Sequence, residues 1–117
     1  MDLDIAIQKH AEWKMKFRTA IVRQDTMDAT TIGKDNCCDL GKWLHGEGKN
    51  RHGALRSHAE CVRNHAAFHR EAAKVALAIN ARKYDAAIKM IDGGTGYANA
   101  SNEIAGAIIR LKKEARL

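Results

Sequence analysis

Apolar residues near the start of the chain recur at intervals of three and four positions. Over residues 2–23 the stripe consists of Leu3, Ile7, His10, Ala11, Lys14, Phe17 and Ile21. This spacing predicts an amphipathic helix that buries one face. Because a histidine and a lysine lie within the stripe, the buried face of this predicted helix is not purely apolar.

Residues 24–36 lose this periodicity and predict a connection. They are polar or β-branched and include Gly33. Asp35 or Asn36 then suits the N-cap of a short helix from Cys37 to His45, because an Asx side chain accepts hydrogen bonds from free backbone donors. The Gly46–Asn50 segment is expected to end that helix.

An alanine-rich stretch from about His52 to Ala81 contains no proline and predicts one long helix. A short helix over 84–91, a turn at Gly93–Gly96 and a last apolar stripe over 97–111 follow it. No repeat or linker divides the chain, so residues 1–117 are expected to form a single domain. The predicted fold is all-α: an antiparallel four-helix bundle with an additional short helix.

Composition adds to this picture mainly by exclusion. The chain has no proline and only two Phe and two Tyr, as expected for a helical protein. It shows neither a secretory leader nor an apolar run of membrane-spanning length, so a cytoplasmic location without membrane insertion is expected. The net charge of +6 comes from cations interleaved with acids, which does not indicate a nucleic-acid partner.

Three cysteines, an odd number, argue against a disulfide framework in a reducing compartment. Metal ligand, reactive thiol and buried small side chain remain as roles for Cys37, Cys38 and Cys61.

His65 and His69 stand four residues apart in the predicted long helix, so both imidazoles lie on one face and could reach one ion. A hydrogen-bonded, metal-free histidine pair explains this spacing equally well when the pair is taken alone. Further ligands must converge on the pair to decide the question.

Several residues could supply those ligands. His58 and Cys61 project onto the same broad face of the long helix. Cys38, in the first turn of the short helix, is better placed for a lowered thiol pKa than Cys61. His10 lies on the inward stripe of the first helix, although a hydrogen-bonded core histidine would explain it as well. Helical spacing leaves the choice open.

Three segments together resemble the chemoreceptor zinc-binding domain, over nearly the whole chain. They are His10-Ala-Glu-Trp-Lys14, Cys38-Asp-Leu-Gly-Lys-Trp-Leu44 and His65-Ala-Ala-Phe-His69. The family occurs in bacterial chemoreceptors, in diguanylate cyclases and as free-standing proteins.

The resemblance implies a ligand set of His10, Cys38, His65 and His69 around one zinc ion per chain, with the short helix carrying the cysteine ligand. One thiolate and three imidazoles are chemically suited to zinc. It also implies a regulatory input that responds to zinc or to oxidation of the zinc-bound cysteine. Its partner would be a chemoreceptor signalling domain or a diguanylate cyclase domain, and a homodimer is expected.

Other functions fit the sequence less well. A hydrolytic zinc site needs an open coordination position and a general base, yet Ala66 follows His65, so the His-Glu-x-x-His pattern is absent. We therefore expect no enzymatic activity. A purely structural zinc in a helical dimerisation module satisfies the same spacing. A hemerythrin-like di-iron bundle would need more histidines and bridging carboxylates.

Overall fold

The computed structural model describes residues 1–117, and every regular element in it is a helix. The elements are α1 (Leu3–Ala11), α2 (Trp13–Arg23), α3 (Ala29–Ile32), α4 (Asp39–His45), α5 (Glu47–His52), α6 (Arg56–Asn80), α7 (Tyr84–Met90) and α8 (Gly96–Ala115). The predicted all-helical class is confirmed. None of these helices is both long enough and apolar enough to cross a bilayer.

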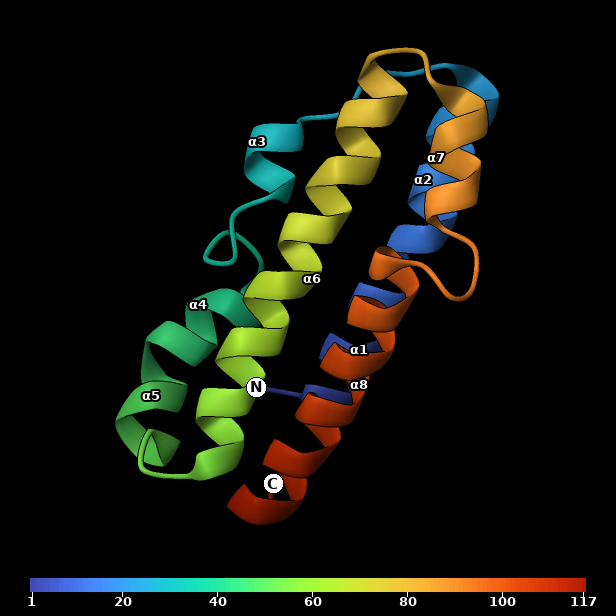
Figure 1. Ribbon diagram of the computed structural model, residues 1–117. Helices are drawn as coiled ribbons and strands as arrows, with labels where there is room; N and C mark the ends of the chain where they lie inside the picture. Colours follow the sequence, from blue (N-terminus) through green and yellow to red (C-terminus); the bar gives the residue numbers. More distant parts are fainter.

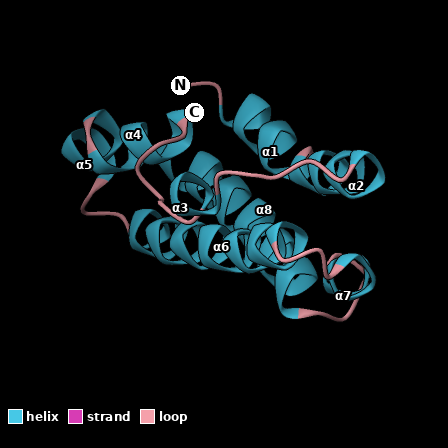
Figure 2. Cartoon of the chain, turned by 90° about the horizontal axis from the view of Figure 1, so that it is seen from above, coloured by secondary structure: helices cyan, strands magenta, loops and turns pink.

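Helices α6 and α8 form the most extensive pairing and run antiparallel (Figure 1). Ser57 at the start of α6 bonds Glu114 at the end of α8, with 2.7 Å between the two oxygens. Helix α1 is likewise antiparallel to α8, because Asp4 pairs with Lys112 at 2.8 Å. In the view from above, α4 and α5 lie at one end of the molecule and α7 at the other (Figure 2).

The first predicted helix is divided in the structure. Helix α1 ends at Ala11, and α2 continues from Trp13 after a turn residue, Glu12. Of the predicted stripe, Leu3, His10, Phe17 and Ile21 are buried, Ile7 and Lys14 are partly buried, and Ala11 is exposed because the chain turns at Glu12. Leu3 and Phe17 are buried in the core together with apolar residues of α6 and α8.

Three boundaries differ from those expected. The connection at 24–36 contains the one-turn helix α3, and the Gly46–Asn50 segment begins α5 rather than a loop. Helix α6 starts at Arg56 instead of His52, because residues 53–55 form a turn that includes Gly53.

The predicted N-cap of the short helix is also wrong. Neither Asp35 nor Asn36 caps α4: Cys38 itself is the N-cap, and its sulfur accepts a hydrogen bond from the Gly41 N–H at 3.4 Å. The thiol thus sits at the point where the chain enters the helix.

Candidate metal centre

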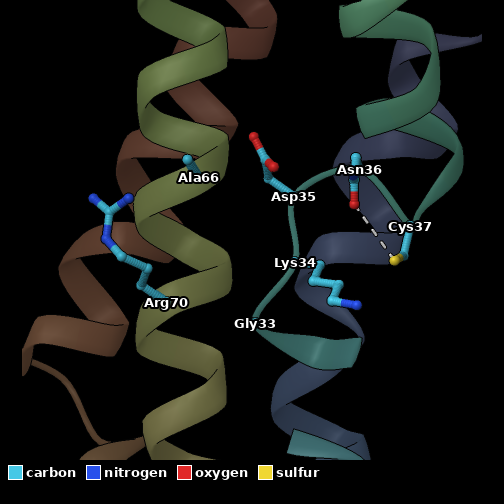
Figure 3. Close-up of a pocket in the computed structure, with 7 residues that line it drawn as sticks. All are labelled: Gly33, Lys34, Asp35, Asn36, Cys37, Ala66 and Arg70. Atoms are coloured by element: carbon cyan, nitrogen blue, oxygen red, sulfur yellow. Dashed lines mark hydrogen bonds between the residues drawn. The ribbon is translucent and has the colours of Figure 1, made fainter. Parts of the chain in front are cut away.

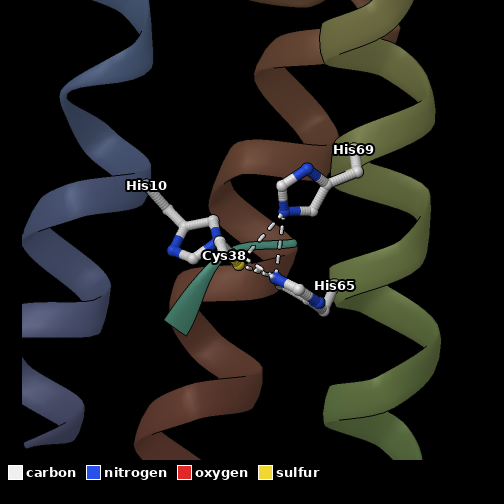
Figure 4. A group of neighbouring side chains, drawn as sticks. All are labelled: His10, Cys38, His65 and His69. Atoms are coloured by element: carbon white, nitrogen blue, oxygen red, sulfur yellow. Dashed lines mark hydrogen bonds between the residues drawn. The ribbon is translucent and has the colours of Figure 1, made fainter. Parts of the chain in front are cut away.

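Four side chains from separate parts of the chain meet between α1, α4 and α6. His10 comes from the end of α1, Cys38 from the N-cap of α4, and His65 and His69 from adjacent turns of α6. Figure 4 shows all four pointing toward one centre. Their nearest donor atoms, three Nε2 and one Sγ, lie within 4.8 Å of one another.

The distances fit a single tetrahedral ion. Cys38 Sγ lies 3.9 Å from His10 Nε2, 3.2 Å from His65 Nε2 and 3.6 Å from His69 Nε2. His65 Nε2 lies 3.1 Å from His10 Nε2 and 3.0 Å from His69 Nε2. Ligands around a tetrahedral zinc stand about 3.3–3.6 Å apart, given the usual zinc–nitrogen and zinc–sulfur bond lengths.

Backbone contacts direct two of the imidazoles toward this centre. His10 Nδ1 donates to the carbonyl oxygen of Ala6 and His69 Nδ1 to that of Ile32, both at 2.7 Å. A proton on Nδ1 leaves Nε2 free as a lone-pair donor. His65 differs, because its buried Nδ1 has no hydrogen-bond partner.

This donor set therefore suits a cation. Lone pairs of His10 and His69 face His65 Nε2 and the cysteine sulfur at short range, which is unfavourable unless a positive charge or a proton lies among them. A metal held by Cys38 Sγ and the three Nε2 atoms would supply that charge and tie α1, α4 and α6 together.

Burial sets the protonation of the donors. It lowers the pKa of His65 to about 2 and lowers the pKa values of His10 and His69, so these imidazoles are neutral near pH 7. For His10 and His69 the hydrogen bonds to Ala6 and Ile32 offset part of this effect. Neutral imidazole is the form that binds a metal.

Cys38 departs from the sequence-based expectation. Burial raises the pKa of its thiol, and the N–H groups of Gly41 and Leu40 only partly oppose that rise. The cost of desolvating the thiolate therefore exceeds the stabilisation that the start of α4 provides, and a bound metal would supply the missing stabilisation.

Neither His58 nor Cys61 joins the group. His58 Nε2 donates to the Leu44 carbonyl oxygen at 2.9 Å, away from the four donors. Cys61 is fully buried in the apolar core, where burial raises the pKa of its thiol to about 12. Both are buried core residues, so sharing a helix face with His65 does not make them ligands.

The residues that support the donors were not apparent from the sequence. Phe68 packs edge-on against the rings of His10 and His69, with centroid separations of 5.3 and 5.5 Å. The acceptor for His10 lies four residues earlier on the same helix, so helical geometry could have indicated it. The Ile32 carbonyl is 37 residues from His69, and no pattern in the sequence signals that pair.

Comparison with known proteins agrees with this geometry. The family model of the chemoreceptor zinc-binding domain matches residues 10–76, a segment that contains all four donors. Searches of curated proteins and of solved structures return no match. The chain belongs to the chemoreceptor zinc-binding domain family, and its His10, Cys38, His65 and His69 side chains form one cluster suited to a single zinc ion.

Proposed function

We propose that the chain is a zinc-binding sensory domain of bacterial signal transduction, with His10, Cys38, His65 and His69 as the ligands of one zinc ion. The convergence of four donors from α1, α4 and α6 carries this proposal. A metal at this point is a crosslink between helices, so losing one ligand would change how those helices pack.

Zinc content of purified variants, measured by mass spectrometry, tests the ligand set. Cys38→Ala should retain less than a tenth of the wild-type zinc, because the only thiolate of the site is lost. Cys37→Ala is the matched control, since Cys37 is exposed and adjacent, and it should keep one zinc per chain. Full retention in Cys38→Ala together with loss in Cys61→Ala would assign the cysteine ligand to Cys61.

The signal that we favour is oxidation of Cys38. Zinc requires the sulfur as thiolate, which is also the form that oxidants attack, and a sulfenic acid is a poorer ligand. Substoichiometric hypochlorous acid followed by peptide mapping should find Cys38 modified before Cys37 and Cys61. If Cys38 stays intact and metallated while another thiol reacts first, oxidation of Cys38 is not the signal, and either zinc concentration is the signal or the zinc is purely structural.

We infer that the domain is not an enzyme. Four protein donors complete a tetrahedron and leave no position for a substrate or an activated water. A hemerythrin-like di-iron site is the remaining architectural rival, and the same mass-spectrometric measurement would reveal it as iron, two per chain.

We further propose that residues 1–117 act as one cytoplasmic domain, an antiparallel four-helix bundle in which α7 is the short fourth member. Contacts of α7 with α2, α6 and α8 support this arrangement. The output would pass to a chemoreceptor signalling domain or a diguanylate cyclase domain.

We also propose a homodimer. Met15 and Val22 stand seven residues apart on one face of α2 and are 72% and 82% exposed, and a partner chain on this face would cover both. Light scattering at high micromolar concentration should report a dimer, and Val22→Glu should weaken it. A monomer at that concentration in the wild-type protein would exclude the dimer.

A further inference from the structure

The adjacent thiols Cys37 and Cys38 open onto different cavities. Cys38 lines a groove of about 730 Å³ between α1 and the start of α4. Cys37 lines a separate pocket of about 430 Å³ between the loop at 33–37 and α6, which Figure 3 shows with Ala66 and Arg70 on the helix side. A reagent held in the groove therefore lies beside Cys38 and not beside Cys37, which is exposed to solvent.

The groove reaches the candidate metal centre from one side. His10 and Cys38 both line it, whereas His65 and His69 do not. His65 is fully buried and His69 is 3% exposed, while Cys38 is half-buried. A small molecule that approaches the cysteine sulfur through this groove need not displace α6.

Charged side chains on the groove wall cancel one another. The cations are Lys9, Lys16 and Lys42, and the acids are Asp2, Glu12 and Asp39. Lys9 and Asp39, next in sequence to His10 and Cys38, pair at 3.7 Å and so bridge α1 and α4 beside the two donors. Steering of ions requires charge of one sign, which this groove lacks.

Apolar groups complete the groove. Ile5, Ala6, Trp13 and Leu40 contribute to its wall. Lys16 Nζ lies 4.5 Å from the centroid of the Trp13 ring, so part of the cationic charge is already engaged. The wall thus combines apolar groups with charges that sum to zero, and Lys9 and Lys16 are already engaged. This favours small uncharged molecules, because an ion that entered would lose hydration without a net opposite charge to compensate.

The pocket at Cys37 has the opposite character. Lys34 and Arg70 line it and have no ion-pair partner, whereas its one acid, Asp35, contacts His45 Nε2 at 3.0 Å. Anionic reagents should accumulate there more readily than at Cys38.

We propose that the groove between α1 and α4 is a binding and access site for small uncharged thiol-directed molecules, and that these reach the Cys38 sulfur, while anionic ones are directed to Cys37. Its role in sensing rests on the proposed function. The groove thereby selects which class of oxidant or thiol reagent acts on the zinc ligand.

Three methanethiosulfonates with the same reactive group provide the test: the uncharged methyl compound, the anionic sulfonatoethyl compound and the cationic trimethylammonioethyl compound. In each reaction the cysteine sulfur forms a bond to the reagent's divalent sulfur, methanesulfinate leaves with the electron pair, and the thiol proton passes to solvent. Peptide mapping of the whole chain over time gives separate rates for Cys37 and Cys38, the Cys37 rate serving as an internal reference.

The uncharged reagent should give a Cys38-to-Cys37 rate ratio at least several-fold above that of the anionic reagent. Ile5→Trp, at a groove position that is 47% exposed, should slow Cys38 labelling several-fold and leave Cys37 unchanged. Ile109→Trp is the matched control on α8, 44% exposed and outside the groove, and should change neither rate.

Three results would overturn the proposal: equal ratios for all reagents, no effect of Ile5→Trp on Cys38, or no Cys38 labelling by the uncharged reagent in chelator-treated, zinc-free protein while Cys37 reacts fully. Zinc content, measured on the same samples, keeps the two proposals apart. Absence of zinc contradicts the proposed function alone, since the labelling ratios and the effect of Ile5→Trp report the groove with or without the metal.

Discussion

Gly41 shows how closely single residues pack around the cysteine. A Cβ atom at this position would overlap the Asp35 carbonyl oxygen and would lie 3.1 Å from His65 Cε1. The Gly41 N–H also donates a hydrogen bond to Cys38 Sγ. The loop and the helix can approach this closely only because residue 41 has no side chain.

Gly41→Ala should therefore displace the loop that carries Cys38 and weaken zinc binding at least tenfold, measured by competition with a chromogenic chelator. Gly106→Ala is the matched control: its Cβ would meet only the flexible end of Arg110 at 3.2 Å. In that helix interior, alanine should stabilise the fold by about 0.5–1 kcal/mol and leave zinc affinity unchanged. Wild-type affinity in Gly41→Ala would show that the loop can move without cost to the site.

Tyr97 is buried between Phe17 and Phe68, and its hydroxyl has no hydrogen-bond partner. Tyr97→Phe should therefore stabilise the protein at pH 7 by about 1 kcal/mol, because a buried polar group without a partner is removed. Urea unfolding measures the change. A lower midpoint in the variant would mean that the hydroxyl does bond a partner, for example a buried water.

The same residue predicts a loss of stability in alkali. Burial raises the pKa of Tyr97 from 10.0 to about 12 in the folded chain. The tyrosine therefore ionises at a lower pH in the unfolded chain than in the folded one. The full stability is present below pH 10 and declines as the pH rises toward 12. Tyr97→Phe should lose less stability between pH 9 and pH 11 than the wild type, although the buried Cys61 thiol will contribute to the decline in both.

At the scale of elements, the start of α6 depends on the end of α8. Leu55 offers no side-chain cap to α6; instead Glu114 Oε1 accepts from the Ser57 N–H at 3.2 Å and from the Ser57 hydroxyl at 2.7 Å. A carboxylate at a helix N-terminus satisfies free donors and complements the helix dipole. The long helix is thus capped by a tertiary contact.

Glu114→Ala should lower the Tm at pH 7, whereas Glu103→Ala, at an exposed position of α8 without an ion-pair or hydrogen-bond partner, should not. The hydrogen bonds from Ser57 lower the pKa of Glu114 below 4.5. The stability that the ionised Glu114 contributes is therefore fully present above pH 4.5 and is lost as the pH falls through the lowered pKa of Glu114 in the folded chain. The difference between Glu114→Ala and the wild type should therefore shrink at pH 3, and a difference unchanged at that pH would contradict the assignment.

At the scale of the whole molecule, the candidate metal centre joins regions of unequal packing. Helices α6 and α8 form the most extensive pairing, whereas α4 and α5 lie outside it and contact mainly each other and α6, with Leu40 and Leu44 of α4 buried in the core (Figure 1). A metal ligated by Cys38 would add a further link from this region to α1 and α6.

Removing zinc with a chelator should therefore increase amide hydrogen exchange most in residues 35–52, while protection in the α6–α8 pairing stays close to that of the zinc-loaded protein. The Cys38→Ala variant should show the same pattern before chelation. Uniform loss of protection along the chain would instead mean that the metal is required for the entire fold.

The helical class, the inward stripes and the motif residues were predictable from the sequence because all three depend on local periodicity and residue type. His65 and His69 share a face through helical spacing alone. Cys38 and His10 could be joined to them only by resemblance to a family, since spacing within one helix says nothing about distance between helices.

Tertiary structure decided the rest. It placed the Ile32 carbonyl against His69, made Cys38 the cap of α4 and raised the thiol pKa through burial, against the expectation from the helix N-terminus. It also turned Cys37 and Cys38, neighbours in sequence, toward different cavities. Each outcome depends on which distant segments pack together and exclude water, and that is a property of the assembled helices rather than of any segment alone.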